Sequence, residues 1–316
     1  MNWLAIEAQR LTRQFGNFTA LDRLDLAVPE HRIHGLVGPN GSGKSTTLAI
    51  FAGFLQPSSG WATALGLRIP EDFSALKQHT GYMSGSCPFH GHLTVEECLK
   101  FMARIYGLPV RKRRARLSQL LTEFDLQQVR KQSVIDLSGS HRQCLALAAA
   151  TIHWPELLFL DEPTRGMAPE SREYFWEKLD ALCHHQGTTI LLATHQLEEA
   201  ERCHSLTLLE SGEKRAEGTP KQLVANIDVR VIEISGNRLD IVKERALTLP
   251  EVYSARIKND ILRILIDRQI TEPLLWLKQE LAELLPGRQI TSATAGLKDV
   301  FIRYANLQPA LDRQCS

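Results

Sequence analysis

A short glycine-rich segment, GPNGSGKST from Gly38 to Thr46, carries the residue types that can hold a chain of phosphates. It fits the pattern G-x-x-x-x-G-K-[ST] and lies between an apolar stretch, IHGLVG, and a run typical of a helix, TTLAIFAGFL. The glycines let the backbone approach an anion closely, so that successive N–H groups point at its oxygens. The positive end of the following helix would strengthen the same attraction.

Two side chains complete the chemistry of this segment. Lys44 can place its ammonium on the outer phosphates, and the Ser45 hydroxyl is a ligand for Mg²⁺. A loop that only turned the chain would leave both residues unexplained. The segment therefore predicts a nucleoside triphosphate site with Mg²⁺, and the predicted binding residues are Gly38, Pro39, Asn40, Gly41, Ser42, Gly43, Lys44, Ser45 and Thr46.

A second segment supplies two adjacent acids. LLFLDEP is an apolar run typical of a buried strand, and it ends in Asp161 and Glu162. A carboxylate at the end of a strand that neighbours a phosphate loop is placed to hold Mg²⁺, so we assign Asp161 to the metal. Glu162 would then orient or deprotonate the attacking water. Further along, TTILLATH ends another apolar strand with His195, which is placed to reach the terminal phosphate.

The elements around these residues alternate between strands and helices, which indicates an α/β layer fold with a parallel central sheet. The run 94–107 begins with Thr94 and has Glu97 three residues later, a pattern that predicts a helix with a capping box. Leucines at helical spacing predict a second helix over about 111–127. LALAAATIHW has the composition of a buried helix.

The pattern changes near residue 225. From there the sequence predicts a strand, a helix, two strands of a hairpin, a second helix and a last strand before LKDVFIRY. The order β-α-β-β-α-β is that of ferredoxin-like domains. We therefore expect two domains, 1–224 and 225–316, the second a small α+β accessory domain.

Composition excludes several function classes. The chain has 316 residues and a formal net charge of +1, so no global field favours nucleic acid as a partner. No apolar run approaches the length of a membrane-spanning helix. Glu7 lies where a secretory leader would be apolar, so no signal peptide is expected. The six cysteines are scattered rather than paired at metal-binding or redox spacing, which is typical of free thiols.

Together these segments resemble the ABC ATPase family. GPNGSGKST is similar to its Walker A loop, and LLFLDEPT to its Walker B strand with the catalytic glutamate. His195 in LLATHQLEEAERC matches the family's switch histidine. Phe15 in TRQFGNFTAL falls where the family has an aromatic ring that stacks on adenine. LSGSHRQCLALAAA lies where the family has its LSGGQ signature, and the tail resembles that of export-type, multidrug-efflux-like members.

The resemblance implies a P-loop NTPase (RecA-like) core with ABC β and helical subdomains, the helical one over about 86–145. It implies two ATPase subunits, as a homodimer or a heterodimer, that enclose ATP and Mg²⁺ between one Walker A loop and the partner's signature. Ser138 and Gly139 of the signature would donate to the γ-phosphate across the dimer. The pair of ATPase subunits would be peripheral proteins on the cytoplasmic side of the cell membrane, where they would energise a separate integral membrane transporter subunit.

The sequence departs from the family pattern in three places. The signature reads LSGSH, with Ser140 and His141 in place of glycine and glutamine. Ser140 adds a Cβ, which would be costly if the backbone needed a positive φ there. The family's glutamine that touches Mg²⁺ aligns with Gly85, and Ala168 replaces the aspartate that crosses the dimer interface.

These departures leave alternatives open. The chain is a slow ATPase in a homodimer, or half of an asymmetric pair with a second ATPase subunit, and we expect slow hydrolysis by the isolated chain. Two other classes compete with transport: a soluble ABC ATPase that acts on ribosomes or DNA, and a regulatory subunit that binds ATP without hydrolysing it. The transported substrate is not readable here, because the membrane subunit would select it.

Overall fold

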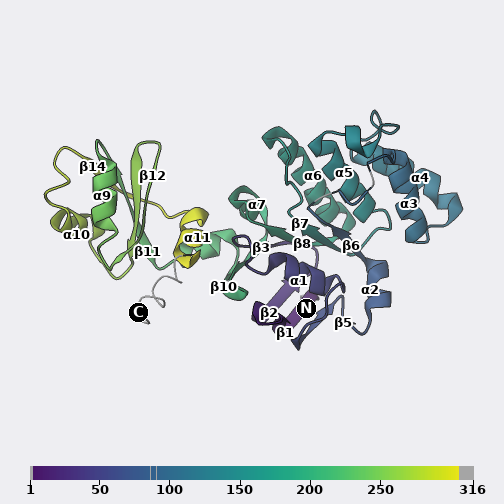
Figure 1. The fold of residues 1–316 in the computed structure, drawn as a ribbon, viewed down its shortest axis with the longest axis horizontal. Helices are drawn as coiled ribbons and strands as arrows, with labels where there is room; N and C mark the ends of the chain where they lie inside the picture. Colours follow the sequence, from purple (N-terminus) through teal and green to yellow (C-terminus); the bar gives the residue numbers. More distant parts are fainter. Residues whose placement is uncertain (1–2, 86, 90, 306–316) are drawn as a thin grey trace. The chain divides into compact units, whose positions relative to one another are not determined.

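A computed structural model describes residues 3–85, 87–89 and 91–305 of the chain (Figure 1). The chain divides into two compact units, Met1–Lys214 and Arg215–Ser316. The boundary falls inside β10, ten residues before the one expected from the sequence. Domains over 1–224 and 225–316 stay a prediction.

The first unit contains a four-stranded antiparallel sheet. Its strand order is β2-β1-β4-β5, and the long β1 and β2 form a hairpin in which Phe15 pairs with Phe18. Apolar residues alternate along β2, as expected for a sheet with one buried face. The strands are β1 (Leu4–Phe15), β2 (Phe18–Pro29), β4 (Ser59–Ala64) and β5 (Leu67–Ile69).

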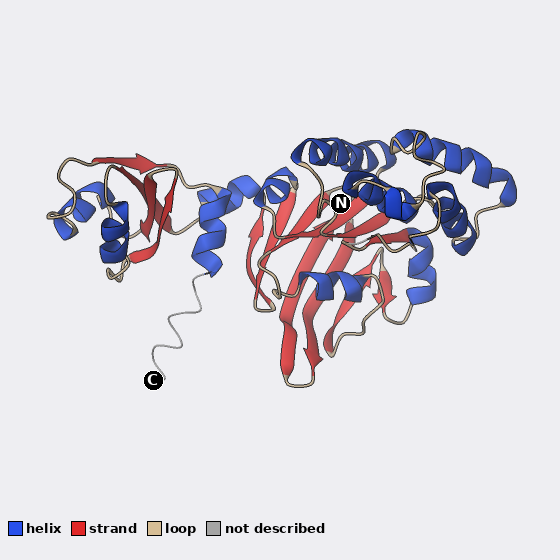
Figure 2. Ribbon diagram, turned by 45° about the horizontal axis from the view of Figure 1, so that its top comes forward, coloured by secondary structure: helices blue, strands red, loops and turns tan. Residues whose placement is uncertain are grey.

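A second sheet has six strands, in the order β10-β9-β3-β8-β7-β6 (Figure 2). The neighbouring strands from β9 to β6 are parallel, which confirms the predicted parallel sheet. Every residue of β3 and β8 is buried, because helices cover both faces. The strands are β3 (Ile33–Val37), β6 (Thr80–Met83), β7 (Leu157–Asp161), β8 (Thr189–Thr194), β9 (Ser205–Glu210) and β10 (Glu213–Gly218).

Helix α1 joins the two sheets, because it contacts β7 and β8 of one and β2 and β4 of the other. One hydrophobic core runs through all of these elements, with Leu48 and Phe51 of α1 fully buried in it. The helices of the first unit are α1 (Lys44–Phe51), α2 (Phe73–His79), α3 (Val95–Ile105), α4 (Val110–Glu123), α5 (Gly139–Ala150), α6 (Pro169–Gln186) and α7 (Leu197–Arg202).

Helices α3, α4 and α5 pack together in the region expected to be the helical subdomain. The predicted capping box of α3 is confirmed: Thr94 Oγ1 accepts from the Glu97 N–H, and the Glu97 carboxylate accepts from the Thr94 N–H at 2.9 Å. In α5, all residues from Gln143 to Ala150 are buried, which confirms the first part of the predicted buried helix LALAAATIHW. The helix ends at Ala150, before the predicted end, and Trp154 is 48% exposed.

The second unit has the element order β-α-β-β-α-β between two flanking helices. Its four strands are antiparallel in the order β12-β13-β11-β14, and α9 and α10 pack on a core of their own. The elements are α8 (Pro220–Ala225), β11 (Val229–Ser235), α9 (Leu239–Ala246), β12 (Val252–Lys258), β13 (Ile261–Asp267), α10 (Pro273–Glu280), β14 (Gln289–Ala293) and α11 (Leu297–Ala305). No helix in the described part of the chain has the length and apolar character to cross a bilayer.

Candidate functional site

The loop between β3 and α1 depends on glycine at two positions. A Cβ on Gly38 would lie 2.0 Å from the Leu209 carbonyl oxygen, so only glycine fits against that strand. Gly43 has φ +98° and is the N-cap residue directly before α1, and no side chain among the described residues caps the helix. The N–H groups of the first turn are therefore left to an external acceptor, as a phosphate site requires.

Lys44 holds its ammonium inside this loop. Its Nζ donates to the Gly38 carbonyl at 2.9 Å and the Pro39 carbonyl at 2.8 Å. Burial lowers the pKa of Lys44, and the carboxylates of Glu162 and Asp161 oppose that effect. The ammonium is thus placed between the loop and the two acids, where an anion would be attracted.

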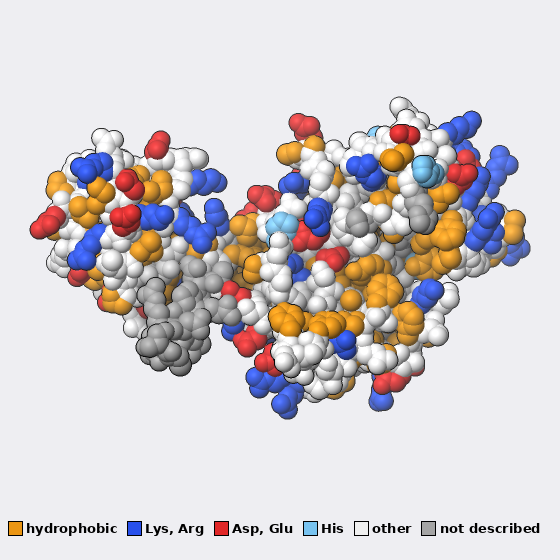
Figure 3. All heavy atoms as spheres, viewed as in Figure 1, with side chains coloured by type: hydrophobic (Ala, Val, Ile, Leu, Met, Phe, Trp, Pro, Cys, Tyr) orange, Lys and Arg blue, Asp and Glu red, His pale blue; other side chains and the backbone are white. Residues whose placement is uncertain are grey.

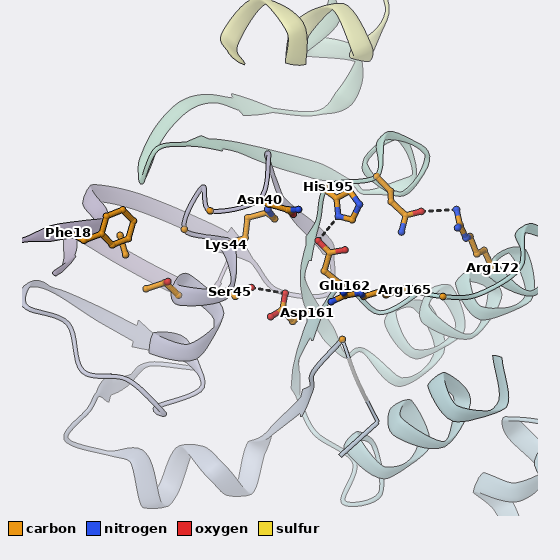
Figure 4. A pocket seen from close by; sticks show the side chains of 16 residues that line it. Phe18, Asn40, Lys44, Ser45, Asp161, Glu162, Arg165, Arg172 and His195 are labelled. Carbon is orange, nitrogen blue, oxygen red and sulfur yellow. Dashed lines mark hydrogen bonds and ion pairs between the residues drawn. The ribbon is translucent and has the colours of Figure 1, made fainter. Parts of the chain in front are cut away.

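Ser45 and Asp161 meet at the other side of the loop. The Ser45 hydroxyl donates to Asp161 Oδ1 at 3.1 Å, which joins the start of α1 to the end of β7 (Figure 4). Burial raises the pKa of Asp161, and the neighbouring charge of Glu162 adds to that, whereas the Ser45 hydrogen bond and Lys44 lower it. A hydroxyl and a carboxylate are the hard oxygen ligands that Mg²⁺ prefers, so the pair fits the predicted metal role.

Glu162, which follows Asp161 directly, forms a pair with His195. Glu162 has a left-handed backbone with φ +50°, and its N–H donates to the Ala193 carbonyl at 2.8 Å. One carboxylate oxygen, Oε1, lies 2.6 Å from His195 Nδ1. The other, Oε2, is buried and has no hydrogen-bond partner among the residues that the structure describes. A buried acceptor without a partner needs a donor, such as a water molecule.

These groups surround one cavity of about 910 Å³. Figure 4 shows Lys44, Ser45, Asp161, Glu162 and His195 gathered in it, from the start of α1 and from the ends of β7 and β8. The structure thus brings together five residues that the sequence singled out in three distant segments. Gly38, Pro39 and Ser42 of the predicted phosphate loop are not among the described residues that line the cavity. The lining residues are Phe18, Ala20, Asn40, Gly41, Gly43, Lys44, Ser45, Thr46, Gly85, Asp161, Glu162, Arg165, Gly166, Arg172, His195 and Gln196.

Two arginines and a glutamine in this lining were not predicted from the sequence. Arg165 follows the Walker B acids, and its positive charge lowers the pKa of Asp161. Arg172 donates through Nη1 to Gln196 Oε1 at 2.7 Å, which joins α6 to the segment after His195. Only its proximity to the acids could have drawn attention to Arg165. Arg172 and Gln196 meet through the fold.

The aromatic residue in the cavity lining is Phe18. The sequence singled out Phe15, which pairs with Phe18 across the β1–β2 hairpin. Phe15 is 46% exposed, carries the Arg13 guanidinium 4.5 Å above its ring, and is not among the described residues that line the cavity. Phe18 is 62% exposed and free to stack on a flat ring. A role for Phe15 stays a prediction, and Phe18 is the better placed candidate.

The signature residues lie elsewhere. Ser138 caps α5, and its Oγ accepts from the His141 N–H at 3.1 Å and lies 3.0 Å from His141 Nδ1. Gly139 abuts Gly166, where a Cβ would come within 2.8 Å of the carbonyl oxygen. Neither Ser138 nor Gly139 lines the described cavity, so contact with a phosphate would need a second copy or a partner.

The three departures have different structural consequences. Ser140 lies in the first turn of α5 and is not among the described residues with positive φ, so its Cβ carries no backbone penalty. Gly85 lines the cavity. A Cβ at this position would lie 3.1 Å from the Asp161 carbonyl oxygen, so a larger residue would be packed tightly there. Ala168 precedes α6 and offers it no side-chain cap, which an aspartate could provide.

Comparison with known proteins identifies the family. The family model described as ABC transporter matches residues 21–165. A probable multidrug ABC transporter ATP-binding protein, YbhF of Escherichia coli, is 40% identical over 220 residues, which are 70% of this chain and 38% of that protein. The chain therefore spans less than half the length of that relative.

A second relative aligns over nearly its whole length. The Nod factor export ATP-binding protein I of Burkholderia pseudomallei is 35% identical over 305 residues, 96% of this chain and 97% of that one. The solved structure of an ATP binding subunit of an ABC transporter superposes with a TM-score of 0.64 at 28% identity, covering 70% of this chain and 92% of that chain. The chain has a P-loop NTPase fold and belongs to the ABC transporter family, within which it is an ATP-binding subunit.

Proposed function

We propose that this chain hydrolyses ATP to drive a separate, membrane-embedded export subunit. One observation carries the hydrolytic part of the proposal. Glu162 is held by His195 through Oε1, while Oε2 is buried without a partner inside a cavity that also holds Lys44. A carboxylate in this state is ready to accept a proton from a water molecule.

The residues of the chain divide the work. The N–H groups at the start of α1 and the ammonium of Lys44 bind the phosphates and neutralise charge that grows on the outer one. Glu162 Oε2 orients the attacking water and takes its proton. His195 holds the Glu162 carboxylate through Nδ1 and leaves the rest of its ring exposed to the terminal phosphate. Phe18 offers its exposed ring to the base of the nucleotide.

The donors present also fit Mg²⁺. Ser45 Oγ and Asp161 Oδ1 already lie 3.1 Å apart, and Asp161 has a raised pKa that a cation would relieve. We assign these two residues to the metal. When bound, Mg²⁺ would neutralise charge on the phosphate oxygens.

The partners follow from the same geometry. Ser138 and Gly139 lie outside the chain's own cavity, which supports a dimer of ATPase subunits in which each signature serves the other's nucleotide. The contact of His141 with Ser138 Oγ occupies that hydroxyl, which favours slow hydrolysis at the site this signature completes. The names of the relatives above support export. We also propose that the chain works as a peripheral protein on the cytoplasmic side of the membrane. We further propose that the second unit is a ferredoxin-like accessory domain.

The variant Glu162→Gln tests the proposal. It removes the general base but keeps the size of the side chain, so we expect ATP hydrolysis to fall by about a hundredfold or more while ATP still binds. Glu170→Gln, an exposed position in the first turn of α6, is the matched control. The measurement is phosphate release by the chain with its co-purified membrane partner, beside nucleotide binding.

Equal rates of ATP hydrolysis by Glu162→Gln and by the control would contradict the assignment of Glu162 as the general base. A chain that binds ATP but releases no phosphate in any assembly would instead be a regulatory subunit.

A further inference from the structure

A buried carboxylate lies just outside the cavity, on α7. Glu199 is 2% exposed, and each of its oxygens accepts one threonine hydroxyl. Thr164 Oγ1 donates to Oε1 at 2.5 Å, and Thr194 Oγ1 donates to Oε2. A buried carboxylate lowers stability unless its oxygens are hydrogen-bonded, so this arrangement is a specific feature rather than a surface charge.

The two threonines belong to the segments that carry the reacting groups. Thr164 comes two residues after Glu162, and Thr194 directly precedes His195. Both threonines are fully buried. The carboxylate of Glu199 therefore spans the end of β8 and the segment after β7, close to the point where Glu162 and His195 meet at 2.6 Å.

Gln196 closes the ring from the other side. Its N–H donates to Thr194 Oγ1 at 3.0 Å, and its Nε2 donates to Thr164 Oγ1 at 3.4 Å. Arg172 donates a hydrogen bond to the side-chain amide oxygen of Gln196. Because both threonine oxygens accept from Gln196, both hydroxyl hydrogens point to Glu199. The ring therefore needs two acceptors at position 199, which a carboxylate supplies and an amide does not.

We propose that Glu199 is a positioning residue for ATP hydrolysis, which sets the distance between Glu162 and His195 by holding Thr164 and Thr194 together. The inference rests on the proposed function, since it assigns Glu162 and His195 their roles. Glu199 itself touches neither the cavity nor the phosphates, because it is not among the described residues that line the cavity.

The charges that face Glu199 are consistent with this role. Burial raises the pKa of Glu199, and the negative charge of Glu162 adds to that effect. The two threonine hydrogen bonds and Arg172 oppose it. The threonine hydrogen bonds and Arg172 favour the ionised carboxylate that the hydroxyl directions require, against the larger effect of burial, which raises the pKa.

The test compares Glu199→Gln with Glu198→Gln, its exposed neighbour on the same helix. In Glu199→Gln one threonine faces an N–H₂ instead of an acceptor, so the two segments separate. We expect kcat for ATP to fall about 10- to 100-fold, in line with the effect of a small misplacement. The Kd for ATP should stay within about twofold, because the phosphate loop is untouched. Glu198→Gln should match the unchanged chain in both quantities.

A second measurement reports position directly. The side-chain nitrogen signals of His195, assigned by their loss in His195→Gln, depend on the contact of Nδ1 with Glu162. We expect Glu199→Gln to shift these signals in ¹⁵N-histidine NMR spectra, and Glu198→Gln to leave them in place. If Glu199→Gln does not fold, Thr164→Val and Thr194→Val remove one hydroxyl each and must shift the same signals.

The outcomes separate the two proposals. An unchanged His195 signal in Glu199→Gln overturns the positioning role, whatever happens to kcat. A shifted signal with unchanged kcat also overturns it. If the unchanged chain hydrolyses no ATP in any assembly, including that with its membrane partner, the proposed function fails, and the His195 spectrum still decides whether Glu199 sets the distance between Glu162 and His195.

Discussion

At the scale of single residues, the site places two acids side by side where charge is costly. Asp161 and Glu162 are adjacent at the end of a buried strand, and both face Lys44. Burial and the like charge of Glu162 raise the pKa of Asp161. The ionised carboxylate of Asp161, which suits Mg²⁺, therefore lowers the stability of the metal-free fold.

Asp161→Asn should stabilise the nucleotide-free chain while it removes Mg²⁺-dependent activity. A raised pKa means that the ionised group destabilises the fold at a pH above that pKa, and that the penalty disappears as the pH falls through it. We expect the Tm of Asp161→Asn to exceed that of the unchanged chain by about 1–3 °C at pH 8. The gap should close as the pH is lowered toward the ordinary pKa of 3.8, measured by calorimetry without nucleotide.

The matched control is Asp240→Asn, an exposed position on α9. It should leave the Tm unchanged at every pH. A Tm of Asp161→Asn below that of the unchanged chain at pH 8 would contradict the argument, because it would make the Ser45 hydrogen bond worth more than the buried charge costs.

At the scale of elements, the phosphate loop depends on β3 and its neighbours. His34 on β3 joins β9 by two contacts: its Nδ1 lies 2.7 Å from Ser205 Oγ, and its Nε2 lies 2.9 Å from Thr207 Oγ1. Burial, with the charge of Lys214, lowers the pKa of His34 to about 3. The strand that leads into the loop is thus held by a neutral, fully buried imidazole.

This imidazole should make the fold sensitive to acid. Its stabilising effect is complete above the ordinary pKa of 6.5 and is lost as the pH falls toward the folded value of about 3, because the unfolded chain takes up the proton first. The loss is about 1.4 kcal/mol for each pH unit below 6.5. His34→Gln should be less stable than the unchanged chain at pH 7, and the difference should shrink by that amount per unit down to pH 4.5.

Free energies of unfolding in urea at several pH values measure this difference. The exposed His185→Gln is the control and should show no change in the pH dependence. Parallel pH curves for His34→Gln and the unchanged chain would show that His34 already takes up its proton in the folded state.

At the scale of the whole molecule, the chain combines a nucleotide-binding unit with a smaller one that has its own core. Figure 3 shows charged side chains of both signs spread over the visible faces of the two units. The boundary between the units lies within β10, which forms the edge of the six-stranded sheet. Separate cores predict that nucleotide binding survives without the second unit.

Truncation tests this prediction. Residues 1–224 keep the whole of β10 and should fold and bind ATP with a Kd within about twofold of the full chain. Residues 1–214 lose most of β10 and expose the edge of β9, so we expect a lower Tm and aggregation. Insolubility of both chains, or loss of ATP binding by residues 1–224, would show that the first unit does not fold independently.

A feature can be predicted from the sequence when residues close together along the chain determine it. The phosphate loop and the capping box of Thr94 are contained in nine and four residues, and the neighbours along the chain decide them. The apolar runs that end in Asp161 and His195 predicted buried parallel strands, and thus a shared edge. Their order in the sheet, β10-β9-β3-β8-β7-β6, needed the fold, because strand pairing joins residues far apart in sequence.

The sequence by itself determined the nucleotide chemistry, since a loop of amides, an ammonium and two acids at strand ends are local patterns with one physical use. Only the tertiary structure decided that Phe18 rather than Phe15 lines the cavity, that Ser140 needs no positive φ, and that Glu199 joins the segments that carry Glu162 and His195. These facts depend on which way a side chain points and on what lies opposite it. Both are set by packing between segments that the chain order leaves apart.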